Sequence, residues 1–188
     1  MDKLSSITFD LPGITNGDEA FIHNNTLLTF EGDLENMTSA VSMFEDSRLN
    51  TFKGSLKNLT DGGRMFYSEY DGPGTNWYYD KLSFETDSLE LLENGKNMFY
   101  ETQVRVKDGI WNYDMPNLTD GSYMFGSDDY SSSFKIFDAD LSSLTNGFRM
   151  FNYNYTITKV KTNLSNLQDG TYMFHRCRLD RESIEHLI

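Results

Sequence analysis

Apolar residues recur along this chain in one fixed phrase, with polar residues between them. The clearest copy runs from Leu141 to Phe151 and reads Leu, two residues, Leu, one residue, Asn or Asp, Gly, two residues and Met-Phe. Seven copies span residues 11–21, 34–44, 56–66, 89–99, 115–125, 141–151 and 164–174. Such self-similarity is typical of repeat proteins, in which each unit buries its apolar face against its neighbours.

The closing phenylalanine of each copy sets the period. These residues are Phe21, Phe44, Phe66, Phe99, Phe125, Phe151 and Phe174. Their separations are 22, 23 or 26 residues, except for 33 residues between Phe66 and Phe99. We therefore predict one solenoid domain over residues 1–188, built from units of 22–26 residues, with an insertion loop over residues 67–81.

A further apolar residue lies four positions before the first Leu of most copies. Those residues are Phe30, Phe52, Trp111, Phe137 and Val160, and Phe84 lies five positions before Leu89. Around them, segments such as 49–53 alternate apolar and polar residues, which is typical of a short, half-buried strand. One strand per unit predicts coils that stack in parallel and hydrogen-bond to one another.

The Asn/Asp-Gly pair of each phrase has two interpretations. Asn-Gly between apolar runs is a strong signal for a hairpin with a type I′ turn. Alternatively, the Asn or Asp side chain caps a helical turn that directs Met and Phe inward. We favour the helical turn, because one hairpin per unit requires twice the strands that the pattern offers. In the second copy Ser39 replaces Asn, and serine caps helices well.

These patterns predict an α/β repeat solenoid with one short parallel strand and one short helical turn per unit. Residues 180–188 depart from the phrase. Asp180 is a suitable cap residue, and Ile184, Leu187 and Ile188 follow at helical spacing. We expect an amphipathic capping helix there that covers the last coil.

The phrase resembles the leucine-rich repeats of BspA-like bacterial surface proteins and the related Met-Phe repeats of mycoplasma and Bacteroidales surface proteins. The first copy, with Leu11-Pro12 and Ala20-Phe21, is most similar to the BspA form, and the last, with Phe174 and Cys177, to the Met-Phe form. Similar repeats occur in phages of gut Bacteroidales. The resemblance implies a curved, right-handed, leucine-rich-repeat-like coil used for adhesion, recognition or assembly, and it supplies no catalytic residues.

Composition narrows the possible partners. The formal charge of −13 argues against nucleic-acid binding and against an anionic membrane surface, since both require clustered Lys and Arg. The single cysteine, Cys177, cannot form an internal disulfide. The first ten residues contain no apolar run that would indicate a signal peptide, and no segment reaches transmembrane length.

No motif predicts catalysis, a cofactor or a metal site. His23, His175 and His186 are scattered, and Asp138-Ala139-Asp140 is too short for a calcium loop. Sequons that begin at residues such as Asn36 and Asn58 lie within the repeat phrase, where turn chemistry explains the Asn better than glycosylation does. We therefore expect that the chain is not an enzyme.

Two sets of residues are candidates for binding. The residues of the first set directly follow the strand aromatics and should point outward from the sheet. They form either a sheet-face ladder of weak ion pairs or a charged groove. The set comprises Glu31, Lys53, Glu85, Asn112, Asp138 and Lys161. The second consists of tyrosines and a tryptophan after the phrases, which the repeat should bring to one edge. It comprises Tyr67, Tyr70, Trp77, Tyr78, Tyr79, Tyr100, Tyr113, Tyr130, Tyr153 and Tyr155. These rings either bind a partner, as in recognition loops, or pack over the coil edge.

We therefore expect a non-enzymatic binding or assembly protein whose partner is a protein or a surface glycan. One hypothesis is a phage virion component, structural or receptor-recognising, that is made in the host cytoplasm without a signal peptide. The alternatives are the adhesive domain of a bacterial cell-surface protein, if the chain is a fragment, and an intracellular scaffold. The exposed ends of a solenoid also allow an oligomer.

Overall fold

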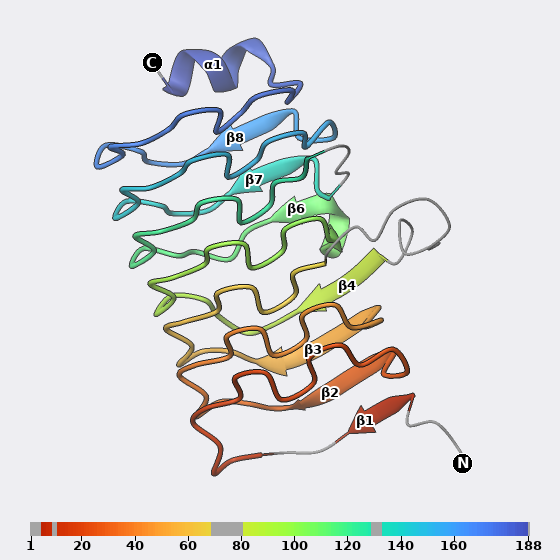
Figure 1. The fold of residues 1–188 in the computed structure, drawn as a ribbon. Coiled ribbons are helices and arrows are strands. Elements are labelled where there is room, and N and C mark those ends of the chain that lie inside the picture. Colours follow the sequence, from red (N-terminus) through yellow and green to blue (C-terminus); the bar gives the residue numbers. More distant parts are fainter. Residues whose placement is uncertain (1–4, 9–10, 69–80, 129–132, 188) are drawn as a thin grey trace.

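The protein forms a parallel β-solenoid, an elongated stack of coils with the two termini at opposite ends (Figure 1). The computed structural model describes residues 5–8, 11–68, 81–128 and 133–187. The repeat solenoid expected from the phrase is therefore confirmed. We number the coils 1 to 7 after the copies of the phrase, in chain order.

One wall of the stack is made of short parallel strands. The first sheet has the order β1 (Ser6–Thr8), β2 (Thr29–Asp33), β3 (Thr51–Ser55), β4 (Lys81–Glu85) and β5 (Gln103–Arg105). The second has the order β6 (Ile110–Trp111), β7 (Ile136–Asp138) and β8 (Lys159–Lys161). The second residue of each strand, such as Phe30, Phe52 or Phe137, is buried and its neighbours are more exposed, as the alternating pattern predicts.

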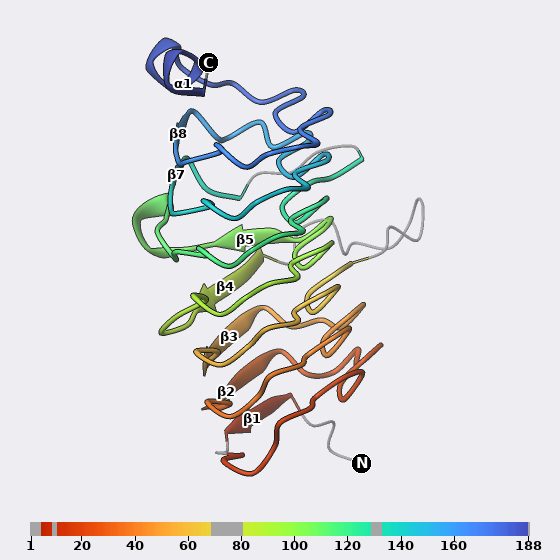
Figure 2. The same ribbon diagram turned by 90° about the vertical axis from the view of Figure 1, so that its left-hand side faces the viewer.

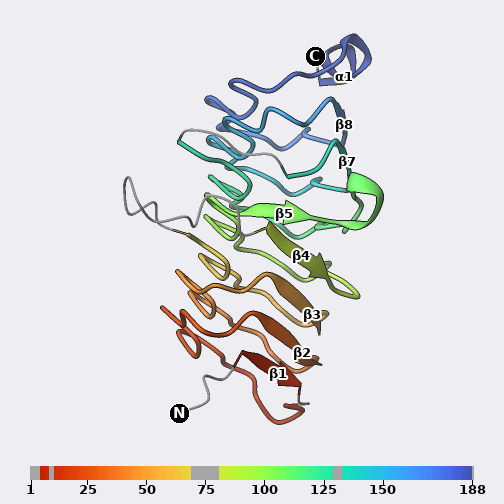
Figure 3. The ribbon, with the colours of Figure 1, turned by 90° about the vertical axis from the view of Figure 1, so that its right-hand side faces the viewer.

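The two sheets are separated by extra residues between β5 and β6. A 3-10 turn, η2 (Lys107–Gly109), lies there, with positive φ at Asp108 and Gly109. Figures 2 and 3 show this segment extending from the strand side of the stack. The interior is nevertheless continuous, because the Trp111 ring stacks on Phe84 with centroids 5.7 Å apart.

A second wall is built from turns, which we call the turn wall. It comprises residues 16–23, 39–46, 61–68, 94–101, 120–127, 146–153 and 169–176. The first residues of these segments form a continuous series of parallel bridges from Asn16 to Asp169. In each segment, the residue before Met or its equivalent has a positive φ of 54–59°, as at Arg64 and Arg149. The expected helical turn per unit is therefore wrong, because this residue is left-handed and every second N–H group of the segment bonds to the next coil.

The hairpin interpretation of Asn/Asp-Gly is also wrong, since these residues pair with neighbouring coils in parallel. The capping chemistry, however, is present. Asp61 Oδ1 accepts a hydrogen bond from the N–H two residues later, at 3.0 Å, and Asn94 and Asp120 do the same. The side chain therefore fixes an Asx turn and not a helix.

Leu, Met and Phe of the phrase fill the interior, as predicted. The seven closing phenylalanines stack from Phe21 to Phe174, with centroids 5.2–5.6 Å apart and rings within 10° of parallel. The strand rings Phe30, Phe52 and Phe84 form a second ladder, which meets the first edge to face. Edge-to-face and offset stacking are the favoured arrangements of aromatic pairs.

The chain closes with a seven-residue helix, α1 (Arg181–Leu187), beside β8. Asp180 caps it through bonds from the Ser183 N–H and hydroxyl. Ser183 is buried, but Ile184 is 47% exposed. The expected apolar cap through Ile184 is therefore wrong, because a polar serine faces the last strand.

Candidate functional site

The outward-facing ladder follows the strand register. Glu31 lies opposite Lys53, and Lys53 lies opposite Glu85 with Nζ and Oε1 3.6 Å apart. Asp138 and Lys161 form a similar pair in the second sheet, at 3.1 Å. Asn112 directly follows β6 and is exposed. The break between the sheets therefore divides the ladder into two parts.

A polar groove of about 550 Å³ lies over the carboxyl ends of β1 to β4. We call it the sheet-face groove. It is lined by Thr8, Glu31, Gly32, Asp33, Glu35, Lys53, Gly54, Ser55, Lys57, Glu85, Thr86 and Asp87. Its floor is bare where Gly32 and Gly54 pair across β2 and β3. The groove thus includes three residues of the expected ladder.

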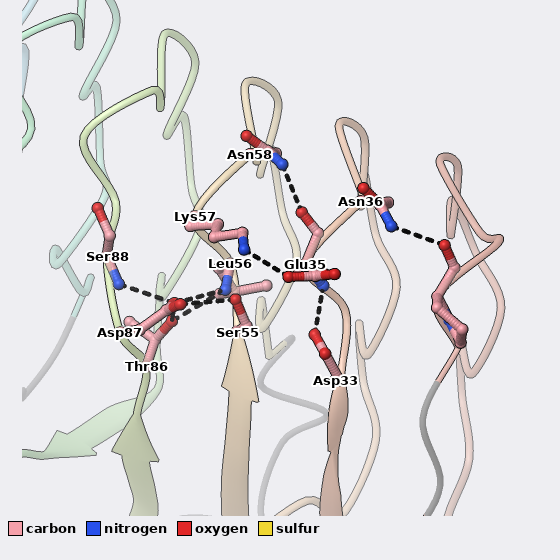
Figure 4. A network of polar contacts seen from close by, with 11 residues as sticks. Asp33, Glu35, Asn36, Ser55, Leu56, Lys57, Asn58, Thr86, Asp87 and Ser88 are labelled. Carbon is pink, nitrogen blue, oxygen red and sulfur yellow. Dashed lines mark hydrogen bonds and ion pairs between the residues drawn. The ribbon is translucent and has the colours of Figure 1, made fainter.

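Hydrogen bonds hold the rim of this groove (Figure 4). Asp87 accepts bonds from the Ser55 hydroxyl at 2.7 Å and from the Leu56 N–H at 3.1 Å. Burial raises the pKa of Asp87, but these bonds outweigh it and the pKa lies below its ordinary value. Lys57 pairs with Glu35. Much of the charge in the groove is therefore already engaged with neighbouring coils.

Asparagine side chains in the phrase link the coils beside this rim. The Asn58 amide donates to the Glu35 carbonyl at 2.6 Å, and Asn36 donates to Pro12 at 2.7 Å. Asn117 repeats the contact with Glu90 at 2.8 Å. These bonds give the sequon asparagines a structural role.

The expected tyrosines divide between two regions. Tyr67, Tyr100 and Tyr153 belong to the turn wall, and Tyr155 packs against Tyr153. Tyr113 lies apart, edge to face against Phe84 and Trp111, and its burial raises its pKa. Five further expected residues lie outside the described part of the chain: Tyr70, Trp77, Tyr78, Tyr79 and Tyr130.

Aromatic rings on the turn wall form a chain of contacts from coil to coil. Tyr67 stacks on Tyr100 with centroids 5.5 Å apart, and Tyr100 meets Tyr123 edge to face at 5.5 Å. Tyr123 then contacts Phe148 at 5.3 Å. The Arg64 guanidinium lies 3.8 Å from the Tyr67 ring centroid, at one end of this chain. Side chains from coils 3 to 6 thus form one surface.

A second cluster continues the surface towards the last coil. The Arg149 guanidinium lies 5.5–5.7 Å from the rings of Tyr123, Phe148 and Tyr172. His175 contacts both Tyr172 and Tyr153. Arg149 retains 35% side-chain exposure and Tyr172 is 55% exposed. Both side chains are therefore accessible from solvent.

We call the combined surface the aromatic edge. It comprises Arg64, Tyr67, Tyr100, Tyr123, Phe148, Arg149, Tyr153, Tyr155, Tyr172, His175 and Arg176. Sequence reasoning missed His175 and Arg176, and it also missed Arg64, Tyr123, Phe148, Arg149 and Tyr172. The last five occupy the two variable positions between Gly and Met, and this recurrence of Arg and aromatic residues was the signal that could have identified them.

Ion pairs and burial fix the orientation of two side chains at this edge. Arg64 binds Glu45 through two hydrogen bonds of 2.6 and 2.8 Å, which hold the pKa of Glu45 below its ordinary value. Tyr100 is 8% exposed. Its burial, and then its hydrogen bond with Asp128, raise its pKa. The edge is therefore held in place by its own contacts.

In the part of the chain that the structure describes, no group of three or more His, Cys, Asp or Glu side chains is placed to hold a metal ion. The described residues also include no helix with the length and apolar character needed to cross a membrane. No family model matches the chain, and no curated protein or solved structure compared with it does so either.

Proposed function

We propose that this chain is a non-enzymatic binding and assembly protein that holds a partner protein at its aromatic edge. The observation behind this proposal is the continuous contact of Tyr, Phe and Arg side chains across coils 3 to 7. Tyr and Arg are enriched among the residues that dominate protein interfaces. Neighbouring rings already restrain these side chains, which lowers the entropy lost on binding.

A surface glycan is the alternative ligand, because exposed rings such as Tyr172 could also stack on a sugar. As for the setting, we favour a phage virion component with a structural or receptor-recognition role. The adhesive domain of a bacterial surface protein and an intracellular scaffold are the alternatives. The resemblance to BspA-like repeats and the right hand of the coil also stay predictions.

A binding screen with paired variants tests the proposal. The purified chain is screened against immobilised virion proteins, host surface proteins and a glycan array. For any ligand found, Arg149→Ala combined with Tyr172→Ser should weaken binding at least about tenfold, since interface residues of these types often contribute more than 1 kcal/mol. Both side chains are partly exposed, so the free energy of unfolding should change by no more than about 0.5 kcal/mol each.

The sheet-face groove is the second candidate site, favoured by its volume and its position over the strand ends. Lys53→Ala provides the matched arm of the experiment, because Lys53 is 58% exposed and its ion pair with Glu85 lies at the surface. Loss of binding in this variant, with retention in the edge variant, would assign the ligand to the groove. Loss in neither would refute both sites.

A further inference from the structure

The turn wall has a direction. At each of its six coil-to-coil junctions, four N–H groups of one coil donate to four carbonyls of the next, over 2.8–3.1 Å. Between coils 6 and 7, for example, Gly147 donates to Asp169 and Phe151 donates to Met173. These four bonds all point the same way along the stack. One end of the turn wall therefore presents donors, and the other presents acceptors.

Both ends are open among the described residues. At the last coil, four N–H groups find no acceptor in this part of the chain: those of Gly170, Tyr172, Phe174 and Arg176. At the first coil, four carbonyls receive no hydrogen bond from described residues: those of Asn16, Asp18, Ala20 and Ile22. These N–H groups occupy the repeat positions of the donors inside the stack, and these carbonyls occupy those of the acceptors, so the two rows match in number and spacing.

Polar side chains at the two ends are complementary as well. Inside the stack, Asn94 donates its amide to Asp61 of the preceding coil at 2.9 Å, and Asn146 donates to Asp120 at 3.2 Å. The last coil ends this series with Asp169, and the first coil begins it with Asn16. Asn16 of a second copy would therefore repeat the Asp–Asn contact.

The apolar positions fit in the same way. Within the stack, the space beside Gly121 is filled by Leu144 and Met150 of the following coil, which lie 3.2 Å from the place of a Cβ atom. Beside Gly170, Leu167 of the same coil is the only described residue within 4 Å. Ile14 of the first coil is equivalent to Leu144, and it is 36% exposed where Leu144 is fully buried.

Charge favours the same pairing. Exposed Arg176 lies at the donor end of the wall, and exposed Glu19 lies at the acceptor end. A donor row beside a cation attracts an acceptor row beside a carboxylate.

Helix α1 stands in the way of this pairing. It takes the place of a further strand beside β8, where the Ser183 hydroxyl oxygen accepts the Val160 N–H at 3.0 Å. Figure 2 shows α1 on the strand side of the stack and away from the turn wall. In a second copy, the strand before coil 1 is β1, and docking in register would place β1 where α1 lies.

We propose that the two ends of the solenoid are a head-to-tail docking interface for a second copy of this chain, and that α1 blocks it until displaced. The interface is heterologous, so repeated docking builds a chain of molecules unless curvature closes it. Assembly is thus controlled by a short helix that contacts the last coil through buried Ser183 and through surface ion pairs such as Lys159–Glu182.

Sedimentation velocity on the full chain tests the proposal. The unaltered chain should be monomeric at tens of micromolar. Ser183→Arg, which places a large cation where Ser183 is only 3% exposed, should expel α1 and give concentration-dependent oligomers. Glu185→Pro, which interrupts the helix independently, should do the same. Hydrogen exchange at the Val160 amide, measured at a concentration where the variants are monomeric, verifies that α1 has moved.

Second-site changes test which surfaces meet. Ile14→Asp added to Ser183→Arg should restore the monomer, whereas Ile184→Asp, which alters an exposed isoleucine outside the interface, should not. An equimolar mixture of the unaltered chain with the Ser183→Arg/Ile14→Asp variant should give a one-to-one dimer, because each has one working end. If both helix variants stay monomeric although hydrogen exchange shows that the Val160 amide has been released, the proposed docking interface is wrong. If the unaltered chain forms oligomers, the proposed block by α1 is wrong.

Discussion

At the scale of single residues, one carboxylate compensates for an irregular repeat. Coil 2 has Ser39 where other coils have Asn or Asp, so it lacks its own acceptor for the N–H of Val41. Asp18 of coil 1 supplies that acceptor at 2.8 Å and also binds the Ser39 hydroxyl at 2.6 Å. Burial raises the pKa of Asp18, but these hydrogen bonds outweigh it and lower the pKa below 3.8.

Replacing this carboxylate should therefore destabilise the protein. Asp18→Ala should cost about 1–2 kcal/mol of unfolding free energy, as for the loss of a capping side chain. Ser39→Asp should restore most of it, because the new carboxylate can form the local Asx turn. Urea unfolding of the two single variants and the double variant measures this coupling. If Ser39→Asp does not restore stability in the double variant, Asp18 does not act by supplying the acceptor that coil 2 lacks.

The same carboxylate predicts a dependence on pH. Since its folded pKa lies below the value of 3.8 for the free group, its stabilising contribution is present above pH 3.8. That contribution is lost as the pH falls through the folded pKa. The difference between the unaltered chain and Asp18→Ala should shrink over this acidic range and stay constant near neutrality.

The glycines of the phrase do not supply the left-handed backbone that an Asn-Gly pair suggests. Of the described glycines, only Gly109 has a positive φ, whereas Glu19, Arg64 and Tyr172 have left-handed backbones two residues after a phrase glycine. At Gly95, an added Cβ atom would lie 3.0–3.2 Å from Met124 and Leu118 of the next coil. Glycine is therefore needed for the close approach of neighbouring coils.

At the scale of elements, stacked phenylalanine rings in the interior connect the strands to the turn wall. Phe151 is fully buried and lies between Phe125 and Phe174 in the ladder of closing phenylalanines. Phe174 belongs to the last coil and is only partly buried. Phe151 thus has a stacked phenylalanine on each side, whereas Phe174 has one on a single side.

Truncation of these two rings should reflect that difference. Phe151→Ala should cost about 3–5 kcal/mol, as for a phenylalanine in a packed core. Phe174→Ala should cost clearly less, because its ring already contacts solvent on one side. Guanidinium unfolding with a common m-value provides the comparison. Equal losses, or a negligible loss at Phe151, would contradict the interior ladder.

At the scale of the whole molecule, the break between the two sheets does not divide the core. Phe99 stacks on Phe125 at 5.5 Å, and Trp111 contacts Phe125 edge to face at 4.7 Å. Repeat proteins are stabilised chiefly through such contacts between neighbouring units. The coils on either side of η2 should therefore unfold together.

This coupling can be measured with Trp111 as the reporter in a Trp77→Phe background. Its fluorescence and the far-ultraviolet circular dichroism should report one transition at the same denaturant concentration. Trp111→Ala should weaken the junction and broaden or divide the dichroism transition. Two transitions in the unaltered chain would show that the sheet break separates two folding units.

The sequence alone determined the repeat, the parallel stacking of coils and the buried positions. Burial at Leu, Met and Phe is set by a periodic apolar pattern, which is a local property of the chain. Only the tertiary structure decided the left-handed residues of the turn wall, the meeting of Arg149 with Tyr123 and Tyr172, and the position of α1. These depend on hydrogen bonds and contacts between coils about 20–33 residues apart, where neighbouring coils override local turn and helix preferences.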